Sequence, residues 1–320
     1  NSSFGRGPVV TWLLGVDGGG SKTVAQVARL TSDGELHVRG SGSAGPSNIR
    51  AVGTEQALAN LDRAIDAALA AAERGGKSCD IAVLALAGSS LPDVRQQLGA
   101  WASARRLAAD IEIVHDADAV LAMLPTASAG VALILGTGSA AIGRDAEGRQ
   151  SVVGGWGHLI GDFGSAFDIG RRGLIAATAV VDGIGPQTAL LPALLENLGV
   201  DEPRELVRKL GFATEAKQRI ALLAPLVLAN SAAGDSVAGQ IVDECAAAAA
   251  DLVLAAIQKL DIAGLPGLAL AGGAVCNSRS YRAAVLEKLG ASGQHFDPVV
   301  VVDAPVDGTL RIARNRAAEA

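Results

Sequence analysis

The sequence predicts an α/β protein built from two related units, and two observations lead to this fold class. Short apolar runs alternate with stretches of helical periodicity along most of the chain, which is typical of sheets covered by helices. A strand–turn–strand unit with a glycine-rich turn also occurs twice, near the start of the sequence and again after Ser128. Internal repetition of this kind arises by chance far less often than a single glycine cluster.

The first copy is an apolar run that enters a turn of three glycines. A strand at Thr11–Asp17 leads into Gly18-Gly19-Gly20-Ser21-Lys22, and a second strand covers Thr23–Leu30. Glycines remove the Cβ atoms that would block a ligand and allow positive φ, so backbone N–H groups can converge on an anion. Asp17 could hold a cation or its water shell. A plain tight hairpin is the alternative, but an acid, a lysine and two hydroxyls around three glycines favour phosphate binding.

The second copy, Val131–Gly143, repeats this plan around the turn Gly136-Thr137-Gly138-Ser139. Each copy then runs into an acidic turn, Ser32–Glu35 in the first and Asp145–Gly148 in the second. These turns predict that each strand pair continues into a further hairpin. Two equivalent units that each present a glycine-rich turn predict two half-domains that hold one polyphosphate between them.

The rest of the first unit alternates strands with helices. A strand at Glu35–Gly40 is followed by a loop at Gly42–Asn48, which is too polar for a regular element, and by a helix from Gly53 to Glu73 with Thr54 as its N-cap. The remaining predicted elements are a buried strand at Ile81–Gly88, a helix at Pro92–Leu107, a strand at Ile111–Asp116 and a helix at Ala117–Leu124.

The second unit continues into a glycine-dense loop, Gly154–Ser165, which carries Trp, His and Asp and runs into a helix at Ala166–Val181. Helical periodicity then dominates from Ala189 to Leu260. The last predicted elements are a strand at Gly267–Ala271 that enters a Gly-Gly turn, a helix at Ser278–Leu289, a strand at Val299–Val302 and a terminal helix capped by Asp307–Thr309.

Composition narrows the class of protein. With 320 residues, 49% hydrophobic and 19% charged, the chain can bury two cores. A net charge of −6 argues against a nucleic-acid partner, while it leaves a locally built phosphate site open. The three cysteines, Cys79, Cys245 and Cys276, lack metal-ligand spacing, so a reducing cytoplasm is expected. No apolar run has the length of a membrane span, and no secretory signal precedes the first strand, so no membrane partner is expected.

In these motifs the chain resembles the BadF/BadG/BcrA/BcrD ATPase family, which is part of the sugar kinase/heat-shock 70/actin superfamily. Within that family it is most similar to the N-acetylglucosamine kinase-like branch. The resemblance covers nearly the whole chain in the right order. Its motifs are Gly15–Thr23, Ala85–Gly88, His115–Ala117, Leu135–Ser139, Gly154–Ser165 and Ala271–Asn277. The loop Gly154–Ser165 is the most specific of them, because its pattern is characteristic of the amino-sugar kinases of this family.

The resemblance implies an α/β, two-domain actin-like ATPase (ribonuclease H-like) fold with an interdomain cleft. The N-terminal domain would cover residues 8–121 and be completed by a C-terminal helix at residues 307–320. The C-terminal domain, with helical insertions, would cover residues 122–306.

The resemblance also implies ATP and Mg²⁺. Asp17 would hold Mg²⁺ through water, the two glycine turns would bind the phosphates, and the third glycine motif would lie against the adenosine. The nucleotide-binding residues expected in this way are Gly18, Gly19, Gly20, Ser21, Lys22, Thr23, Gly136, Thr137, Gly138, Ser139, Gly272, Gly273 and Asn277.

Asp116, at the exit of a strand, matches the catalytic carboxylate of the family. It would accept the proton of the sugar 6-hydroxyl as the γ-phosphoryl group leaves ATP, a reaction that otherwise asks the protein for alignment and charge neutralisation. The residues expected to bind the sugar are Ser47, Asn48, Asp116, Trp156, Gly157, His158 and Asp162.

Each of these assignments has a plainer alternative. Asp116 could cap the helix that follows it, and Lys22 could point into solvent. Trp156 could be an ordinary core residue, although a tryptophan among glycines has few neighbours to pack against, and stacking on a sugar face is favoured. His158 could be structural, and Asp162 could shape its own turn.

The substrate is less constrained than the reaction. An acetamido sugar needs an apolar pocket for its methyl group, whereas glucosamine as an ammonium ion favours nearby carboxylates. The chain departs from the N-acetylglucosamine kinase pattern at Asp118, an added acid, and at Phe163, where a glutamate is common. These departures favour glucosamine, giving glucosamine 6-phosphate, with N-acetylglucosamine as the alternative. An activator ATPase of a partner reductase is a more distant alternative, and a homodimer is left open.

Overall fold

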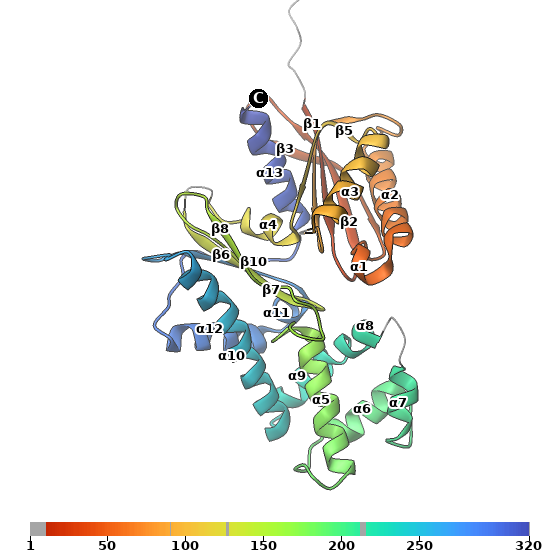
Figure 1. The fold of residues 1–320 in the computed structure, drawn as a ribbon, viewed down its shortest axis with the longest axis vertical. Coiled ribbons are helices and arrows are strands. Elements are labelled where there is room, and N and C mark those ends of the chain that lie inside the picture. Colours follow the sequence, from red (N-terminus) through yellow and green to blue (C-terminus); the bar gives the residue numbers. More distant parts are fainter. Residues whose placement is uncertain (1–10, 90, 126–127, 212–215, 320) are drawn as a thin grey trace, which may run out of the picture. The chain divides into compact units, whose positions relative to one another are not determined.

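The computed structural model describes residues 11–89, 91–125, 128–211 and 216–319. Within them the chain forms two compact units, residues 1–123 with 304–320 and residues 124–303 (Figure 1). The N-terminal positions 8–10 of the first predicted domain lie outside the described residues. Both units are mixed sheets with helices, so the predicted α/β class is confirmed.

The first unit contains a five-stranded sheet in the order β3-β2-β1-β4-β5. Strand β1 pairs antiparallel with β2 and parallel with β4, and β5 is parallel to β4. The strands are β1 (Thr11–Gly18), β2 (Thr23–Leu30), β3 (Leu36–Ala44), β4 (Cys79–Leu86) and β5 (Ala108–Val114). The helices are α1 (Ile49–Val52), α2 (Thr54–Ala71), α3 (Pro92–Ala104), α4 (Asp116–Leu121) and α13 (Val306–Glu319).

Helices cover both faces of this sheet. Leu14 and Val16 of β1 pack against α2 and α3, for instance against Leu61 and Leu98. The neighbouring Leu13 points to the other face and packs against α13. The alternation along β1 is that of a strand with both faces buried. The core therefore fixes the position of both ends of β1.

The second unit repeats the sheet of the first. Its strand order, β8-β7-β6-β9-β10, gives an antiparallel β6–β7–β8 meander followed by parallel β9 and β10. The strands are β6 (Gly130–Leu135), β7 (Ser139–Arg144), β8 (Gln150–Gly154), β9 (Gly267–Ala271) and β10 (Val299–Val302). The internal repeat predicted from the two glycine turns is thus a repeat of sheet topology, including the third strand of each meander.

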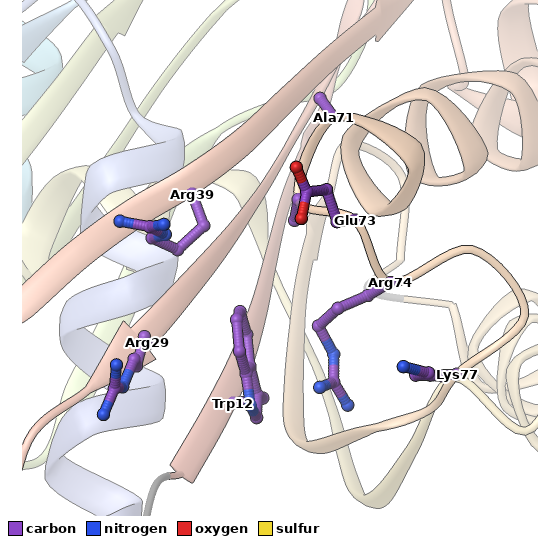
Figure 2. A pocket seen from close by; sticks show the side chains of 8 residues that line it. Trp12, Arg29, Arg39, Ala71, Glu73, Arg74 and Lys77 are labelled. Atoms are coloured by element: carbon purple, nitrogen blue, oxygen red, sulfur yellow. The ribbon is translucent and has the colours of Figure 1, made fainter.

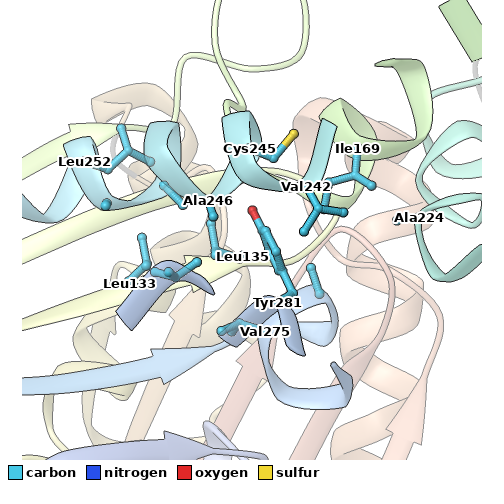
Figure 3. Packing of buried hydrophobic residues seen from close by; sticks show 14 of the residues in the cluster. Leu133, Leu135, Ile169, Ala224, Val242, Cys245, Ala246, Leu252, Val275 and Tyr281 are labelled. Carbon is cyan, nitrogen blue, oxygen red and sulfur yellow. The ribbon is translucent and has the colours of Figure 1, made fainter. Parts of the chain in front are cut away.

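The helices of the second unit form a large apolar core against its sheet (Figure 3). They are α5 (Ala166–Val181), α6 (Leu190–Leu198), α7 (Glu205–Leu210), α8 (Ala216–Ala221), α9 (Ala224–Ala232), α10 (Ser236–Lys259), α11 (Gly273–Asn277) and α12 (Arg279–Ala291). Alanine, Leu, Ile and Val fill this core, with Tyr281 as its largest fully buried side chain. The Tyr281 hydroxyl donates to the carbonyl oxygen of Gly164 at 2.6 Å, so the core holds the end of the glycine-dense loop.

Two local predictions in the first unit are wrong. Of the loop predicted at Gly42–Asn48, the first three residues are the end of β3, which runs to Ala44, while the remaining four lie outside any helix or strand as predicted. A Cβ on Gly42 would lie 2.2 Å from the carbonyl oxygen of Ala64, so these glycines let the backbone of α2 lie directly on the strand. The N-cap of α2 is Gly53, and Thr54 is already its first helical residue.

Among the described helices, none alone has the length and apolarity to cross a membrane. Two segments, Ala216–Ala232 and Ser236–Lys259, reach that length and apolarity only when taken together, and they are bent by 118° at the break between them.

Candidate active site

The predicted catalytic and metal residues of the first unit come from the same edge of its sheet. Strands β1, β4 and β5 are parallel, so their carboxyl ends lie side by side. Asp17 is near the end of β1, and Asp116 begins α4, directly after β5. This edge of a mixed sheet is the usual position of a ligand site in open α/β folds.

The turn after β1 is shaped by close packing. A Cβ on Gly18 would lie 2.3 Å from Oγ of Ser47, and the carbonyl oxygen of Gly19 accepts from the N–H groups of Ser47 and Asn48 at 3.1 and 3.3 Å. A Cβ on Gly20 would meet no described protein atom within 4 Å. The first turn is therefore fixed at Gly18 and open at Gly20, where a ligand can approach the backbone.

The sequence predicts positive φ for the glycines of these turns, and this part of the prediction is wrong. None of the three glycines of the first turn has a positive φ, and the same holds for Gly136 and Gly138 of the second. The glycines are required because there is no room for a side chain, or because the space beside the backbone is open. Unusual backbone angles have no part in it.

The ionised form of the Asp17 carboxyl group is energetically unfavourable in this position. Burial and the negative charge of Asp116 raise its pKa from 3.8 to about 7, and Lys22 opposes this shift. The structure therefore brings together three of the predicted residues, two acids and a lysine. A divalent cation beside the two carboxylates would reverse the effect of their repulsion.

Asp116 is held by the start of α4. Its Oδ1 lies 2.7 Å from Nδ1 of His115 and 3.1 Å from the N–H of Ala117. Asp118 accepts from the N–H of His115 at 2.9 Å and so completes a capping box. Asp118, the acid that departs from the N-acetylglucosamine kinase pattern, is thus a helix-capping residue, while Asp116 keeps its side chain 23% exposed.

His115 couples the two acids of α4 to each other. Burial of its ring lowers the pKa of His115. The hydrogen bond and charge of Asp116, together with the charge of Asp118, raise this pKa by more, so its net shift is upward. A protonated Nδ1 donates to Asp116; a deprotonated Nδ1 can accept from the N–H of Ala117 instead, at 3.2 Å. His115 therefore orients Asp116.

The residues of the first turn fit Mg²⁺ and phosphate. Oγ of Ser47 is buried beneath the turn without a hydrogen-bond partner among the described atoms, and the carboxylates of Asp17 and Asp116 repel each other. Oxygen donors of this kind suit a hard cation that keeps most of its water shell. The buried hydroxyl of Thr23 donates to the carbonyl oxygen of Gly45 at 2.7 Å, and the predicted contact of Thr23 with phosphate stays a prediction.

In the second unit, the turn Gly136–Gly138 is closed by a hydrogen bond from the N–H of Gly136 to the carbonyl oxygen of Gly138 at 3.0 Å. The hydroxyl of Ser139 donates to the carbonyl oxygen of Phe163 at 2.7 Å, so this predicted phosphate ligand ties the turn to the glycine-dense loop. A Cβ on Gly136 would meet no described atom within 4 Å. As at Gly20, the backbone is open to a ligand at that position.

The third glycine motif lies directly on the second turn. A Cβ on Gly272, whose φ is +97°, would lie 2.5 Å from the carbonyl carbon of Leu135 and 2.6 Å from the backbone nitrogen of Gly136. Asn277 ends α11 and lies near Gly273. The structure thus brings the predicted adenosine-binding and phosphate-binding segments of the second unit together.

The glycine-dense loop presents its apolar side chains to solvent. Trp156 is 69% exposed and is therefore not part of the core, and Leu159, Ile160 and Phe163 are also exposed. His158 makes an edge-to-face contact with Phe167 at 5.3 Å between ring centroids, which is the structural role given above as its alternative. The exposed face of Trp156 is free for stacking.

Asp162 is buried and occupied within its own unit. Its Oδ1 accepts from the N–H of Ser139 at 3.1 Å, and its Oδ2 lies 2.8 Å from Nζ of Lys217. Asp162 also has a positive φ of 57°, a conformation that few residues other than glycine adopt. Its backbone and side chain both shape the second turn. Its predicted contact with a sugar stays a prediction.

Lys217 is a residue that sequence reasoning missed. It is on the short helix α8 and reaches Asp162 from far along the chain. Nothing in the local sequence distinguishes it from a surface lysine of an amphipathic helix. Only the folded chain places a cation beside the glycine turn at Gly136–Ser139.

Three comparisons place this geometry among known proteins. The chain is 30% identical over 270 residues to an N-acetylmuramic acid/N-acetylglucosamine kinase of Clostridium acetobutylicum, covering 84% of this chain and 87% of that protein. It is 32% identical over 200 residues to the glucosamine kinase GspK of Vibrio cholerae, covering 60% and 63%. A crystal structure from Chromobacterium violaceum, whose assignment as an N-acetylglucosamine kinase is itself provisional, superposes with a TM-score of 0.73 at 25% identity, covering 94% of this chain and 98% of that one.

These likenesses agree with the two repeated sheets, and the fold is that of the actin-like ATPases. The model of one family matches residues 14–301, which include all the glycine turns as well as Asp17, Asp116 and Asp162. The chain belongs to the BadF/BadG/BcrA/BcrD ATPase family.

Proposed function

We propose that this protein is an ATP-dependent sugar kinase that transfers the γ-phosphoryl group of ATP to the 6-hydroxyl of an amino sugar. The observation that carries the proposal is the grouping of Asp17, Asp116 and Lys22 beside a turn that is open at Gly20. Two carboxylates and a lysine at a glycine turn provide a place for a metal-bound phosphate and a base for the acceptor. The named kinases among the relatives support the same reaction.

In the proposed reaction, Asp116 accepts the proton of the 6-hydroxyl while that oxygen forms a bond to the γ-phosphorus. The bond between this phosphorus and the oxygen bridging to the β-phosphate breaks, and ADP leaves. His115 holds the carboxylate of Asp116 in place through Nδ1. Lys22 and the open backbone at Gly20 contact the phosphate oxygens.

Asp17 would hold Mg²⁺ through its water shell. When bound, the ion neutralises phosphate charge and orients the phosphates for in-line transfer. The ionised form of Asp17 is the one that binds a cation, so metal binding and deprotonation of Asp17 favour each other.

The choice between glucosamine and N-acetylglucosamine depends on whether a carboxylate is free to bind the ammonium group of glucosamine. The sequence favours glucosamine because of two departures, Asp118 and Phe163, but the side chain of Asp118 caps α4 and that of Phe163 is apolar and exposed. Asp162 is likewise engaged with Ser139 and Lys217. The exposed apolar side chains of the glycine-dense loop, with Trp156 and Phe163 among them, provide contacts for an acetyl group. These contacts favour N-acetylglucosamine as the substrate, with glucosamine as the second candidate.

An activator ATPase is not favoured. Burial raises the pKa of the Cys79 thiol to about 11, that of Cys245 to about 12 and that of Cys276 to about 11. The three thiols are also dispersed, since Cys79 is in β4 of the first unit, while Cys245 and Cys276 are in α10 and α11 of the second. Within the described ranges, no three His, Cys, Asp or Glu side chains come together as a metal site.

The test is an ADP-release assay over a panel of sugars with ATP and Mg²⁺. We expect turnover with N-acetylglucosamine and a higher kcat/KM for it than for glucosamine. A higher kcat/KM for glucosamine reverses the substrate assignment and leaves the reaction in place. No sugar-dependent ADP release across hexoses and amino sugars would overturn the proposed reaction.

A further inference from the structure

A basic pocket lies at the opposite end of β1 from Asp17 (Figure 2). Its volume is about 320 Å³, at the lower end of the range for small-molecule sites. Trp12 is at the start of β1, five positions before Asp17, which corresponds to about 17 Å along an extended strand. The residues that line the pocket are Trp12, Arg29, Arg39, Ala71, Ala72, Glu73, Arg74 and Lys77.

Four cations and one carboxylate line this pocket, in a chain whose net charge is −6. Arg29, Arg39 and Lys77 form no ion pair or side-chain hydrogen bond with any other residue that the structure describes. Surface arginines and lysines of an acidic protein ordinarily lie beside carboxylates. A hollow with a local charge of about +3 is an electrostatic environment that favours an anion.

Irregular features of the backbone build the pocket. Arg29 is paired with Trp12 across the β1–β2 ladder. Arg39 is the extra residue of a bulge in β3, since Val27 pairs with Gly40 and Ala28 with Val38. A bulge re-aims a side chain, and here it adds a second arginine beside the one on the neighbouring strand. Figure 2 shows Arg29 and Arg39 on one side of Trp12, with Arg74 and Lys77 on the other.

The end of α2 supplies the other side. A Cβ on Gly40 would lie 2.2 Å from the carbonyl oxygen of Ala68, so the helix end lies directly on the strand. The guanidinium of Arg74 is 4.3 Å from the centroid of the Trp12 ring and donates to the carbonyl oxygen of Ser78 at 2.7 Å. Nε of Arg74 is buried and lacks a hydrogen-bond partner among the described atoms.

Glu73 is in a strained position in this pocket. Its φ is +55°, at the position after a helix where glycine is preferred. The N–H groups of Glu73 and Arg74 close the helix end on the carbonyl oxygens of Ala70 and Leu69. A residue other than glycine costs about 1 kcal/mol in this region, so glycine would be the more stable choice at position 73. Strain of this sort is frequent at binding sites.

We propose that this pocket is a binding site for a small phosphate-bearing anion, separate from the site at Asp17. Arginines on two neighbouring strands match the oxygens of a phosphate, and Lys77 adds a point charge. The small volume of the pocket and the acidic remainder of the chain favour a metabolite over a nucleic acid. The pocket keeps a net positive charge despite Glu73, so an anion with two or more charges is held better than a monovalent one.

The experiment is calorimetric titration of the whole protein with pyrophosphate, without metal ions. Parent protein is compared with Arg29→Gln/Arg39→Gln and with the matched control Arg204→Gln/Arg208→Gln, which removes the same charge from exposed positions of the second unit. We expect the pocket variant to lose at least about tenfold in affinity and the control less than about twofold. Binding that is equal in all three proteins, or equally weakened in both variants, would overturn the proposal.

Trp12 gives a second readout. Pyrophosphate should change the tryptophan fluorescence of the parent, and the change should be absent in Trp12→Phe, although Trp101 and Trp156 remain. A change retained in Trp12→Phe would place binding elsewhere and contradict the assignment. Because neither measurement uses ATP, sugar or turnover, failure of the proposed kinase reaction would leave this result unaffected.

Two variants of Glu73 separate an effect on anion binding from an effect on stability. Glu73→Gln removes the charge and keeps the strained side chain, whereas Glu73→Gly removes both. We expect both variants to bind pyrophosphate about three- to tenfold more tightly, and only Glu73→Gly to raise Tm. Unchanged affinity in both variants would argue against an anion in this pocket. Tighter, salt-dependent binding of a single-stranded oligonucleotide that also requires Arg29 and Arg39 would replace the small anion by a nucleic acid as the occupant.

Discussion

Nδ1 of His115 lies 2.7 Å from Oδ1 of Asp116, the carboxylate that we propose as the base. The two residues span the junction of β5 and α4, and Asp118 closes the same helix start from the other side. The three polar residues of this four-residue stretch thus have three different tasks. In the proposed reaction Asp116 takes the proton of the acceptor, while His115 orients Asp116 and Asp118 closes the start of α4.

This division of tasks predicts different results for two acids that are two residues apart. Asp116→Asn should lower kcat by about a hundredfold or more while N-acetylglucosamine binding stays measurable by calorimetry, because general-base catalysis is lost and the shape is kept. Asp118→Asn is the control: its amide oxygen can still accept from the N–H of His115, so both the stability and kcat should stay nearly unchanged. An Asp116→Asn enzyme within tenfold of the parent, about 1.4 kcal/mol, would show that Asp116 is not the base.

The raised pKa of Asp17 predicts an unusual dependence of stability on pH. A carboxyl group whose pKa is about 7 in the folded protein and 3.8 when unfolded binds more protons in the folded state between these values. Stability therefore falls as pH rises from about 4 to 7, and the destabilising effect is complete above pH 7. The shift of about three pKa units corresponds to at most about 4 kcal/mol.

Asp17→Asn removes that ionisation. In EDTA, the variant should be more stable than the parent at pH 8 by about 2–4 kcal/mol and nearly equal to it at pH 4, as measured by urea unfolding. Addition of Mg²⁺ and nucleotide should stabilise the parent at pH 8 more than the variant. A variant that is less stable than the parent at pH 8 would contradict both the burial of the charge and its repulsion from Asp116.

The sequence was a good guide wherever the pattern was local. Gly18–Thr23 and Gly136–Ser139 follow strands of regular apolar pattern, so the turns, the strands around them and the repeat could be predicted. The extension of β3 to Ala44 could not, because it depends on α2 lying on glycines of the strand. A polar, glycine-rich segment reads as a loop until its tertiary neighbour is known.

The same distinction between local and tertiary signals applies to the residues of the candidate site. Asp17 and Asp116 could be predicted because each follows an apolar strand, and the structure places them near each other. Asp162, Thr23 and Ser139 belong to the right segments, yet their side chains are occupied by partners distant in sequence. Lys217 has no local signal at all. Segments that surround a site can be read from sequence, but which side chains remain free depends on tertiary hydrogen bonds.

The Lys217–Asp162 pair predicts a coupled effect on stability. Lys217→Met leaves the buried Asp162 carboxylate without its cation and should cost about 1–3 kcal/mol, less than a fully buried pair because Lys217 is partly exposed. Asp162→Asn/Lys217→Met should recover most of this loss, since an amide can keep the bond from Ser139 without a charge. Urea unfolding of the four proteins of this cycle gives the coupling energy directly. Additive losses would mean that the pair does not interact.

An added methyl group should have different consequences for stability at Gly272 and at Gly20. Gly272→Ala puts a Cβ within 2.6 Å of the Leu135–Gly136 backbone at a φ of +97°, so it should destabilise the second unit by about 2 kcal/mol or more. Gly20→Ala puts its Cβ into open space at an ordinary φ, so Tm should change by less than about 2 °C. The open space is where we place the phosphates, and Gly20→Ala should weaken nucleotide binding in calorimetry by about tenfold or more. Normal nucleotide affinity in a stable Gly20→Ala protein would remove the first turn from the nucleotide site.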